Sequence, residues 1–232
     1  MKLSIIIPVY NENATVLEIL KKIESIQDIQ KQIIIVDDGS NDGSYQLINS
    51  FNFISEHKII RHDFNSGKGS CIKSAQNYIA GDIVIIQDAD LEYDPNDYNE
   101  IIKAIYKNDK KVVYGSRVLN KTRYDQKNFI SNFRIFANHI LTLLTNFLFL
   151  QNLTDAHTCY KAFDSKVFKE INLKENDFAF CPEITAKVSK LGHKIFEVPI
   201  SYFGRNYNEG KKISFYDGIR AILVLLKYRI FY

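Results

Sequence analysis

A cluster of carboxylates follows directly on one of the most apolar short runs of the chain. The run Ile83–Ile86 is entirely β-branched, and acids stand two residues apart soon after it. A continuous β-branched run predicts a strand covered on both faces, as in a parallel sheet, and such sheets bind ligands just beyond the carboxyl ends of their strands. We therefore expect a ligand site at Asp88, Asp90, Glu92 and Asp94.

Four acids at this spacing repel one another unless a cation lies among them. Carboxylate oxygens are hard ligands of the kind that Mg²⁺ and Mn²⁺ prefer. The pattern therefore predicts a divalent ion that is shared with the phosphate groups of a ligand. A solvated acidic turn is the alternative, because Asp-x-Asp triplets are common in loops. The buried strand that precedes this triplet favours the metal site.

Two further segments combine an apolar strand with polar residues at its end. The first strand, from Leu3, is expected to stop at Pro8, because proline cannot donate to a central ladder. The second, 32–36, runs directly into Asp37 and Asp38. Parallel strands bring such ends to one edge of a sheet, so these polar groups should lie near the acidic cluster.

The elements that position these residues alternate between strand and helix. Alternation of this kind predicts an α/β fold, with a mostly parallel sheet flanked by helices and right-handed crossovers. No repeat, linker or low-complexity segment interrupts it, so we expect a single domain over residues 1–232. The expected strands are 3–7, 32–36, 58–61, 83–86 and 112–117, and the expected helices are 15–23, 44–54, 71–79 and 95–107.

Composition narrows the class of protein and its location. The net charge of +3 gives little support for a nucleic-acid partner. The three scattered cysteines indicate a reducing compartment and buried thiols, and the first residues show no signal-peptide pattern, so a cytoplasmic placement is expected. Three spaced thiols also form no metal-ligand pattern.

Two apolar segments in the second half bear on membrane contact. Residues 135–154 carry no formal charge, yet polar side chains interrupt them, so they fall short of the roughly 20 apolar residues of a spanning helix. A helix buried in the domain and a helix at a membrane interface both remain open. The terminal run 219–232 combines an apolar face with basic and aromatic residues, which favours an interfacial helix, although a helix that closes the core fits as well.

Six short motifs occur together and in one order. They are Pro8-Val9-Tyr10-Asn11-Glu12, Val36-Asp37-Asp38-Gly39-Ser40, Asn65-x-Gly67-Lys68-Gly69, Asp88-Ala89-Asp90, Gly115-Ser116-Arg117 and Arg205-x5-Lys211. In this set the chain resembles the GT-A-fold glycosyltransferases of family 2, and within them the polyprenyl-phosphate sugar transferases, of which the dolichyl-phosphate mannosyltransferases are typical. The resemblance covers almost the whole chain. It implies a Rossmann-like sheet with C-terminal amphipathic helices, a nucleotide-sugar half at 1–117 and an acceptor and membrane-facing half at 118–232.

The resemblance also implies roles for individual residues. Asp90, Arg117 and Asp155 are the implied catalytic residues, and Asp88, Asp90 and Glu92 would bind Mg²⁺ or Mn²⁺. The mannosyltransferases usually carry Gln where this chain has Glu92, so the identity of the donor stays open. Arg117 and Arg134 would hold the phosphate of the acceptor. The nucleotide sugar would be bound by Pro8, Tyr10, Glu12, Val36, Asp38, Lys68, Asp88, Ala89, Arg205 and Lys211.

The resemblance implies an inverting hexosyltransferase that uses GDP-mannose or a UDP-sugar. The implied acceptor is a polyprenyl or dolichyl monophosphate, which is already ionised near neutral pH and attacks without a general base. The enzyme would lie peripherally on the cytoplasmic face of a membrane, with a membrane protein as a further partner. Two alternatives remain: a transferase to a saccharide hydroxyl with Asp155 as its base, and a non-catalytic nucleotide-sugar-binding subunit of a membrane complex.

Overall fold

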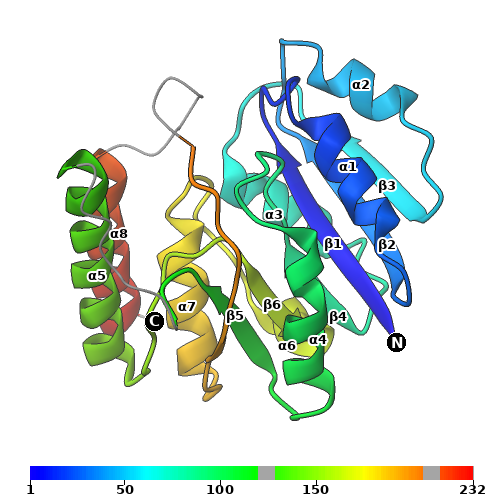
Figure 1. The fold of residues 1–232 in the computed structure, drawn as a ribbon. Helices are drawn as coiled ribbons and strands as arrows, with labels where there is room; N and C mark the ends of the chain where they lie inside the picture. Colours follow the sequence, from blue (N-terminus) through cyan, green and yellow to red (C-terminus); the bar gives the residue numbers. More distant parts are fainter. Residues whose placement is uncertain (120–128, 206–214, 232) are drawn as a thin grey trace.

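The structure, a computed structural model, describes residues 1–119, 129–205 and 215–231 (Figure 1). Within these residues, seven strands form one sheet in the order β3-β2-β1-β4-β6-β5-β7. The strands are β1 (Lys2–Val9), β2 (Gln30–Asp37), β3 (Glu56–Arg61), β4 (Ile83–Ile86), β5 (Val112–Ser116), β6 (Lys161–Asp164) and β7 (Phe196–Pro199). The α-helices are α1 (Val16–Ser25), α2 (Ser44–Ser50), α3 (Lys68–Gln76), α4 (Tyr98–Tyr106), α5 (Phe129–Phe149), α6 (Ser165–Glu170), α7 (Phe180–Lys190) and α8 (Phe215–Ile230).

The sheet is mostly parallel, as the alternation predicts. Strands β3, β2, β1 and β4 run parallel, whereas β6 is antiparallel to both of its neighbours, β4 and β5. Two reversals restore the direction, so β5 and β7 run the same way as β4. The carboxyl ends of β1, β2, β4 and β5 therefore meet at one edge of the sheet, and the start of β6 lies at that edge as well.

Helices cover both faces of the sheet, and a third layer lies outside them. One core cluster joins the sheet to α1, α2 and α4, and a second joins it to α3, α6 and α7. Helices α5 and α8 pack against each other and against α7, and they appear side by side at the left of Figure 1. The inner strands β1, β2 and β4 are thus buried on both faces, which explains their β-branched runs, whereas the edge strands β3 and β7 are only partly covered.

Proline does not end the first strand where the sequence predicts. Pro8 lies inside β1, opposite Val36 of β2, and the strand continues to Val9. The pairing of β1 with β4 ends at Ile6, which accepts a hydrogen bond from the Gln87 backbone, so β1 has β2 as its only paired strand beyond that point. A proline without a donor is tolerated at such a local edge.

The outer helices combine a buried and an exposed apolar face. Ala221, Val224, Leu225 and Tyr228 of α8 are buried against α5 and α7, whereas the opposite faces of both helices are apolar and exposed. The expected packing of the terminal helix on the core is therefore confirmed, whereas its contact with a membrane stays a prediction. Among the described residues, no helix is long and apolar enough to cross a membrane. The exposed residues are Phe136, Ile140, Leu143 and Phe147 of α5, and Tyr216, Ile219, Leu223, Leu226 and Ile230 of α8.

Candidate active site

The acidic turn after β4 is held in a fixed shape by the core beneath it. Gln87 is fully buried, and its Oε1 accepts hydrogen bonds from the hydroxyls of Tyr98 at 2.6 Å and Tyr160 at 2.5 Å. Beyond it, Leu91 adopts a left-handed φ of 62°, which bends the chain back on itself. Asp88 and Asp90 therefore project from a rigid turn at the edge of the sheet.

Basic side chains meet the two acids of this turn. The Lys68 ammonium pairs with Asp88, and one Nη of Arg205 lies 3.0 Å from Asp90. The same guanidinium donates to both oxygens of Glu12, at 3.1 and 3.2 Å. Burial, and then the charges of Asp88 and Glu92, raise the pKa of Asp90 to about 7, and Arg205 opposes this rise. The turn thus holds a local excess of negative charge.

Glu92, the third predicted metal ligand, is hydrogen-bonded to a distant segment of the chain. Its carboxylate accepts hydrogen bonds from the Tyr202 hydroxyl at 2.9 Å and from the Arg205 backbone at 2.7 Å. Its carbonyl accepts from the Phe203 backbone at 2.9 Å. Glu92 therefore fastens the segment 202–205 to the acidic turn. The metal role of Asp88, Asp90 and Glu92 stays a prediction.

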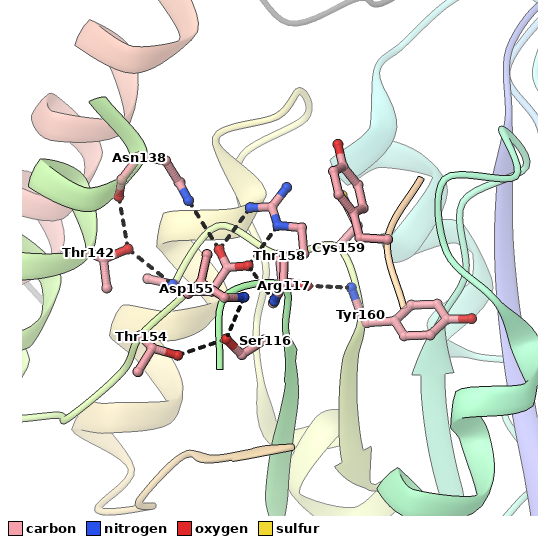
Figure 2. A network of polar contacts seen from close by, with 12 residues as sticks. Ser116, Arg117, Asn138, Thr142, Thr154, Asp155, Thr158, Cys159 and Tyr160 are labelled. Carbon is pink, nitrogen blue, oxygen red and sulfur yellow. Dashed lines mark hydrogen bonds and ion pairs between the residues drawn. The ribbon is translucent and has the colours of Figure 1, made fainter. Parts of the chain in front are cut away.

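A second polar cluster lies next to this turn, at the end of β5 (Figure 2). Arg117 donates to Asp155 through Nε at 2.6 Å, through one Nη at 2.8 Å and through its backbone N–H at 3.1 Å. Asn138 of α5 donates to the same carboxylate at 3.1 Å. Burial alone raises the pKa of Asp155, but Arg117 outweighs it and lowers that pKa to about 2.

The Asp155 loop is itself held from several elements. Glu197 of β7 accepts from the backbone N–H groups of Thr154 at 2.7 Å and of Asp155 at 2.9 Å. Ser116 and Thr154 share a hydrogen bond of 2.7 Å, visible in Figure 2. These contacts hold the Asp155 carboxylate in place. Because Asp155 in turn binds Arg117, the guanidinium has a defined position.

Tyr202 connects the two clusters. Its ring faces the Arg117 guanidinium at 5.1 Å, within the range of a cation–π contact, while its hydroxyl donates to Glu92. Arg117 therefore lies beside the acidic turn.

The residues predicted to bind the nucleoside gather at the ends of β1 and β2. Pro8 and Val36 lie opposite each other in register, and Glu12 reaches Arg205. Asp38, which is buried, accepts hydrogen bonds from the backbone of Ser66 and Gly67 and from His62. Tyr10 is partly buried just beyond β1, and Ala89 is buried in the acidic turn.

Two predicted residues lie outside the described part of the chain. Lys211 falls in the segment 206–214, and Arg134 lies on α5 at a position where the structure describes the backbone alone. The structure also adds residues that motif reasoning did not select. Cys159, expected to be a buried thiol, lies with its Sγ 3.2 Å from the Lys68 ammonium. Asn138, Tyr202 and His62 are the others, and no local sequence signal marks them.

Comparison with known proteins gives one family and many relatives. Residues 4–172 match the profile of "Glycosyl transferase family 2". The chain is 26% identical over 235 residues to a dolichol-phosphate mannosyltransferase from Pyrococcus furiosus, covering 98% of this chain and 64% of that protein. It is 29% identical over 249 residues to a UDP-N-acetylglucosamine–dolichyl-phosphate N-acetylglucosaminyltransferase from Methanococcus voltae, covering 98% and 92%.

Solved structures share the fold. A glucosyl-3-phosphoglycerate synthase from Mycobacterium tuberculosis, in complex with Mg²⁺ and UDP, gives a TM-score of 0.70 at 16% identity over 98% of this chain and 79% of that one. A mannosyltransferase from Pyrobaculum calidifontis, in complex with GDP-Man and Mn²⁺, gives 0.61 at 18% identity over 85% and 54%. The fold is therefore that of the GT-A glycosyltransferases.

Proposed function

The chain belongs to glycosyl transferase family 2, and from that premise we propose that it moves a hexose from a nucleotide sugar to a polyprenyl or dolichyl monophosphate, with inversion at the anomeric carbon. Residues 1–117 supply most of the donor site. Residues 118–232 supply the acceptor side. They also include Arg205, which reaches back to the acidic turn on the donor side.

On the donor side, the residues at the acidic turn fit a divalent ion. Asp88 and Asp90 offer hard oxygen ligands from a rigid turn, and burial, together with the charges of Asp88 and Glu92, raises the pKa of Asp90, a rise that a bound cation would oppose. Once bound, Mg²⁺ or Mn²⁺ would neutralise charge on the departing nucleoside diphosphate. Lys68 and Arg205 lie beside these acids and are placed to contact the phosphate oxygens of the donor.

On the acceptor side, one observation carries the proposal: the Asp155 carboxylate receives four hydrogen bonds from the described residues, three of them from Arg117. A general base needs a free lone pair and a pKa near the working pH, and this carboxylate has neither property. A phosphate monoester, with a second pKa of about 6, is ionised already and needs no base. This supports a phosphate acceptor over a hydroxyl.

The contacts with Asp155 use Nε and one Nη of Arg117, so the second Nη is not part of that pair. We assign it to the acceptor phosphate, because a guanidinium can bind two anions through different edges. Arg134 on α5 is the proposed second phosphate ligand. Asp155 then acts as the group that orients Arg117.

A lipid acceptor must be met at a bilayer, and the exposed faces of α5 and α8 are the proposed contact. Their apolar side chains lie on helices adjacent to the acceptor cluster, since Asn138 of α5 touches Asp155. Peripheral attachment at the cytoplasmic face follows from this proposal. A membrane protein could share the same surface.

Turnover with defined substrates tests the proposal. The purified protein would be incubated with GDP-mannose, UDP-glucose or UDP-N-acetylglucosamine, a short-chain polyprenyl phosphate, and Mn²⁺ or Mg²⁺. We expect one donor to be consumed and the product to carry the opposite anomeric configuration, as read by NMR. Excess chelator should abolish turnover, and the matching polyprenol without phosphate should not react.

Other outcomes separate the alternatives. Transfer to a saccharide hydroxyl, with no reaction of the lipid phosphate, would support the hydroxyl transferase. Tight binding of a nucleotide sugar without turnover on any acceptor would support a binding subunit. Retention of the donor's anomeric configuration would contradict the inverting mechanism.

A further inference from the structure

His62 lies just beyond β3, outside every motif that the family resemblance uses, and its ring joins two elements. Nδ1 lies 2.7 Å from Oδ1 of Asp38, and Nε2 lies 2.8 Å from the hydroxyl of Ser74 on α3. The carboxylate can only accept, so the shared network assigns the proton to Nδ1, with the Ser74 hydroxyl donating to Nε2. The backbone N–H of His62 also donates to the Asp37 carbonyl at 2.8 Å. The ring is thus held on both sides.

Asp38 passes this restraint to the turn that begins α3. Its Oδ1 accepts from the backbone of Ser66 at 3.0 Å, and its Oδ2 accepts from the backbone of Gly67 at 2.7 Å. The carboxylate is 2% exposed, so both bonds are shielded from water and the loss of either would leave a buried group unpaired. The position of the turn therefore depends on the orientation of Asp38.

The turn has little freedom on its other side. Gly67 has φ of 95°, and a Cβ there would lie 2.5 Å from the Asn176 carbonyl oxygen. At Gly69 a Cβ would lie 2.4 Å from the Glu175 carbonyl oxygen. The turn is therefore enclosed between Asp38 and the segment 175–176. Lys68 stands between the two glycines, and its ammonium reaches Asp88 and Cys159.

We infer that His62 is a positioning residue for the diphosphate of the donor. Through Asp38 it holds the Ser66–Gly67 turn, and the turn sets where the Lys68 ammonium lies relative to the phosphate oxygens. This inference rests on the proposed function, because it takes the ligand beside Asp88 to be a nucleoside diphosphate.

A metal held by Asp38, His62 and Cys71 is the competing explanation, because their ligand atoms lie within 4.8 Å of one another. The distance of 2.7 Å between Nδ1 and Oδ1 is that of a hydrogen bond, and Asp38 already accepts two backbone N–H groups. These contacts favour the relay, that is, the hydrogen bonds that lead from His62 through Asp38 to the Ser66–Gly67 turn. Zinc or another metal that copurifies with the protein and is lost in Cys71→Ser would overturn it.

Two substitutions separate the ring nitrogens. The amide nitrogen of His62→Asn replaces Nδ1 and keeps a donor for Asp38, whereas that of His62→Gln replaces Nε2 and keeps only the Ser74 side. His57→Gln on β3 is the matched control, since His57 is exposed and stacks on Phe53. All variants should keep a cooperative melt near that of the parent protein.

The first readout needs no ligand. Hydrogen exchange at the Ser66 and Gly67 amides, and labelling of the Lys68 amine followed by mass spectrometry, should both increase in His62→Gln and stay at the parent level in His62→Asn and His57→Gln. Unchanged exchange and labelling in His62→Gln would overturn the relay. These two measurements remain a valid test of the relay even if the protein proves not to use a nucleotide.

The second readout tests the route through Lys68. With Mn²⁺ present, His62→Gln should raise the Kd of GDP or UDP about tenfold, on the order of one charged hydrogen bond. In the Lys68→Ala background the same substitution should change Kd less than twofold, because the group through which it acts is gone. Equal effects in both backgrounds, or an equal loss for the nucleoside without phosphates, would overturn the inference. If the parent protein binds neither nucleotide, the proposed function fails instead.

Discussion

Arg117 and Asp155 are the residues whose substitution distinguishes the two acceptor chemistries. Arg117→Ala should lower kcat/KM for the lipid phosphate about 10²–10³-fold, because the anion loses a preorganised donor. Asp155→Asn should cost less, since the amide oxygen still accepts one hydrogen bond from the guanidinium. Steady-state kinetics on variants with matched melting temperatures would measure both effects.

Arg117→Lys is the control for this prediction. Lysine retains the charge but cannot pair with Asp155 through two parallel hydrogen bonds, so it should restore little activity. A larger loss for Asp155→Asn than for Arg117→Ala, with a changed pH profile, would contradict the orienting role and favour Asp155 as a base.

His157 gives a prediction about stability and pH. Burial, and then the charge of Lys161, lower the pKa of His157 to about 4, and Nε2 has no hydrogen-bond partner among the described residues. A depressed folded-state pKa means that the neutral form is stabilised. The contribution of neutral His157 to the free energy of unfolding is therefore complete above the unfolded-state pKa near 6.5, and it is lost as the pH falls from there to about 4.

The free energy of unfolding should fall by an amount on the order of 3 kcal/mol over that pH range. Urea unfolding of the parent protein and of His157→Gln at several pH values between 7 and 4 would measure it, since the difference between the two proteins isolates this group. Identical pH dependence in both proteins would show that His157 does not titrate in this way.

Residue types at strand ends could be predicted from the sequence, whereas their partners could not. Asp88 and Asp90 follow a short apolar strand, so a local pattern was enough. Glu92 was predicted to bind metal, but the groups that contact it, Tyr202 and Arg205, are 110 and 113 residues away in sequence. These partners depend on long-range packing that no local pattern records.

Among the elements, two turns contain a glycine with positive φ, Gly67 and Gly192, in different surroundings. Gly67 also has ψ of 159°, a combination that is essentially confined to glycine. Gly67 has φ of 95° and a backbone oxygen 2.5 Å from a built Cβ, while Gly192 has φ of 84° and nothing within 4 Å. Gly192→Ala should therefore cost about 1–2 kcal/mol of backbone strain. Gly67→Ala should cost more, because the chain at 176 must also move. Denaturant midpoints would compare the two, and equal costs would contradict the enclosed turn.

Helix α8 presents a matched pair of leucines. Leu225 is fully buried and Leu223 is 60% exposed. Leu225→Ala should lower the free energy of unfolding by about 2–5 kcal/mol through the cavity that it leaves. Leu223→Ser should leave stability almost unchanged but weaken binding to anionic vesicles. Sedimentation with vesicles and thermal melts would be measured on both, and unaltered vesicle binding in Leu223→Ser would place the membrane contact elsewhere.

Elements with strong apolar periodicity were predictable, and short or unusual ones were not. Strand β6 begins with Lys161, which is fully buried, donates to the Ala156 carbonyl at 2.9 Å and lies 3.8 Å from the centre of the Tyr114 ring. A lysine at the start of a four-residue segment argues against a buried strand from sequence alone. The antiparallel strand in the middle of the sheet was therefore missed.

For the molecule as a whole, ligand binding should be visible as added stability. A nucleoside diphosphate with Mn²⁺, at 100 times its Kd, should add about 2.7 kcal/mol to the free energy of unfolding. Either component alone should add less, because Asp88 and Asp90 repel the phosphates and the phosphates complete the ion's ligands. Thermal shifts with GDP and UDP, each with and without chelator, would measure this. An equal shift in chelator would contradict the metal site.

The fold class was predictable because it follows from repetition along the chain. Strands and helices alternate through the first 117 residues, and β1, β2, β4 and β5 bury apolar side chains, mostly β-branched ones. The arrangement of the second half follows from long-range contacts instead. Helices α5 and α8, far apart in sequence, pack on α7 and on each other, so their individual patterns left the buried and exposed alternatives open.

The reversed strand β6 also imposes an order on folding during synthesis. Strands β1 to β4 can pair as soon as residues 1–86 have left the ribosome, but the outer edge of β4 pairs with β6, which is made much later. Until Lys161–Asp164 emerges, Ile83–Ile86 is an apolar strand edge open to other chains. We therefore expect the nascent chain to need protection of this edge until β6 closes it, and a chain that lacks β6 to aggregate.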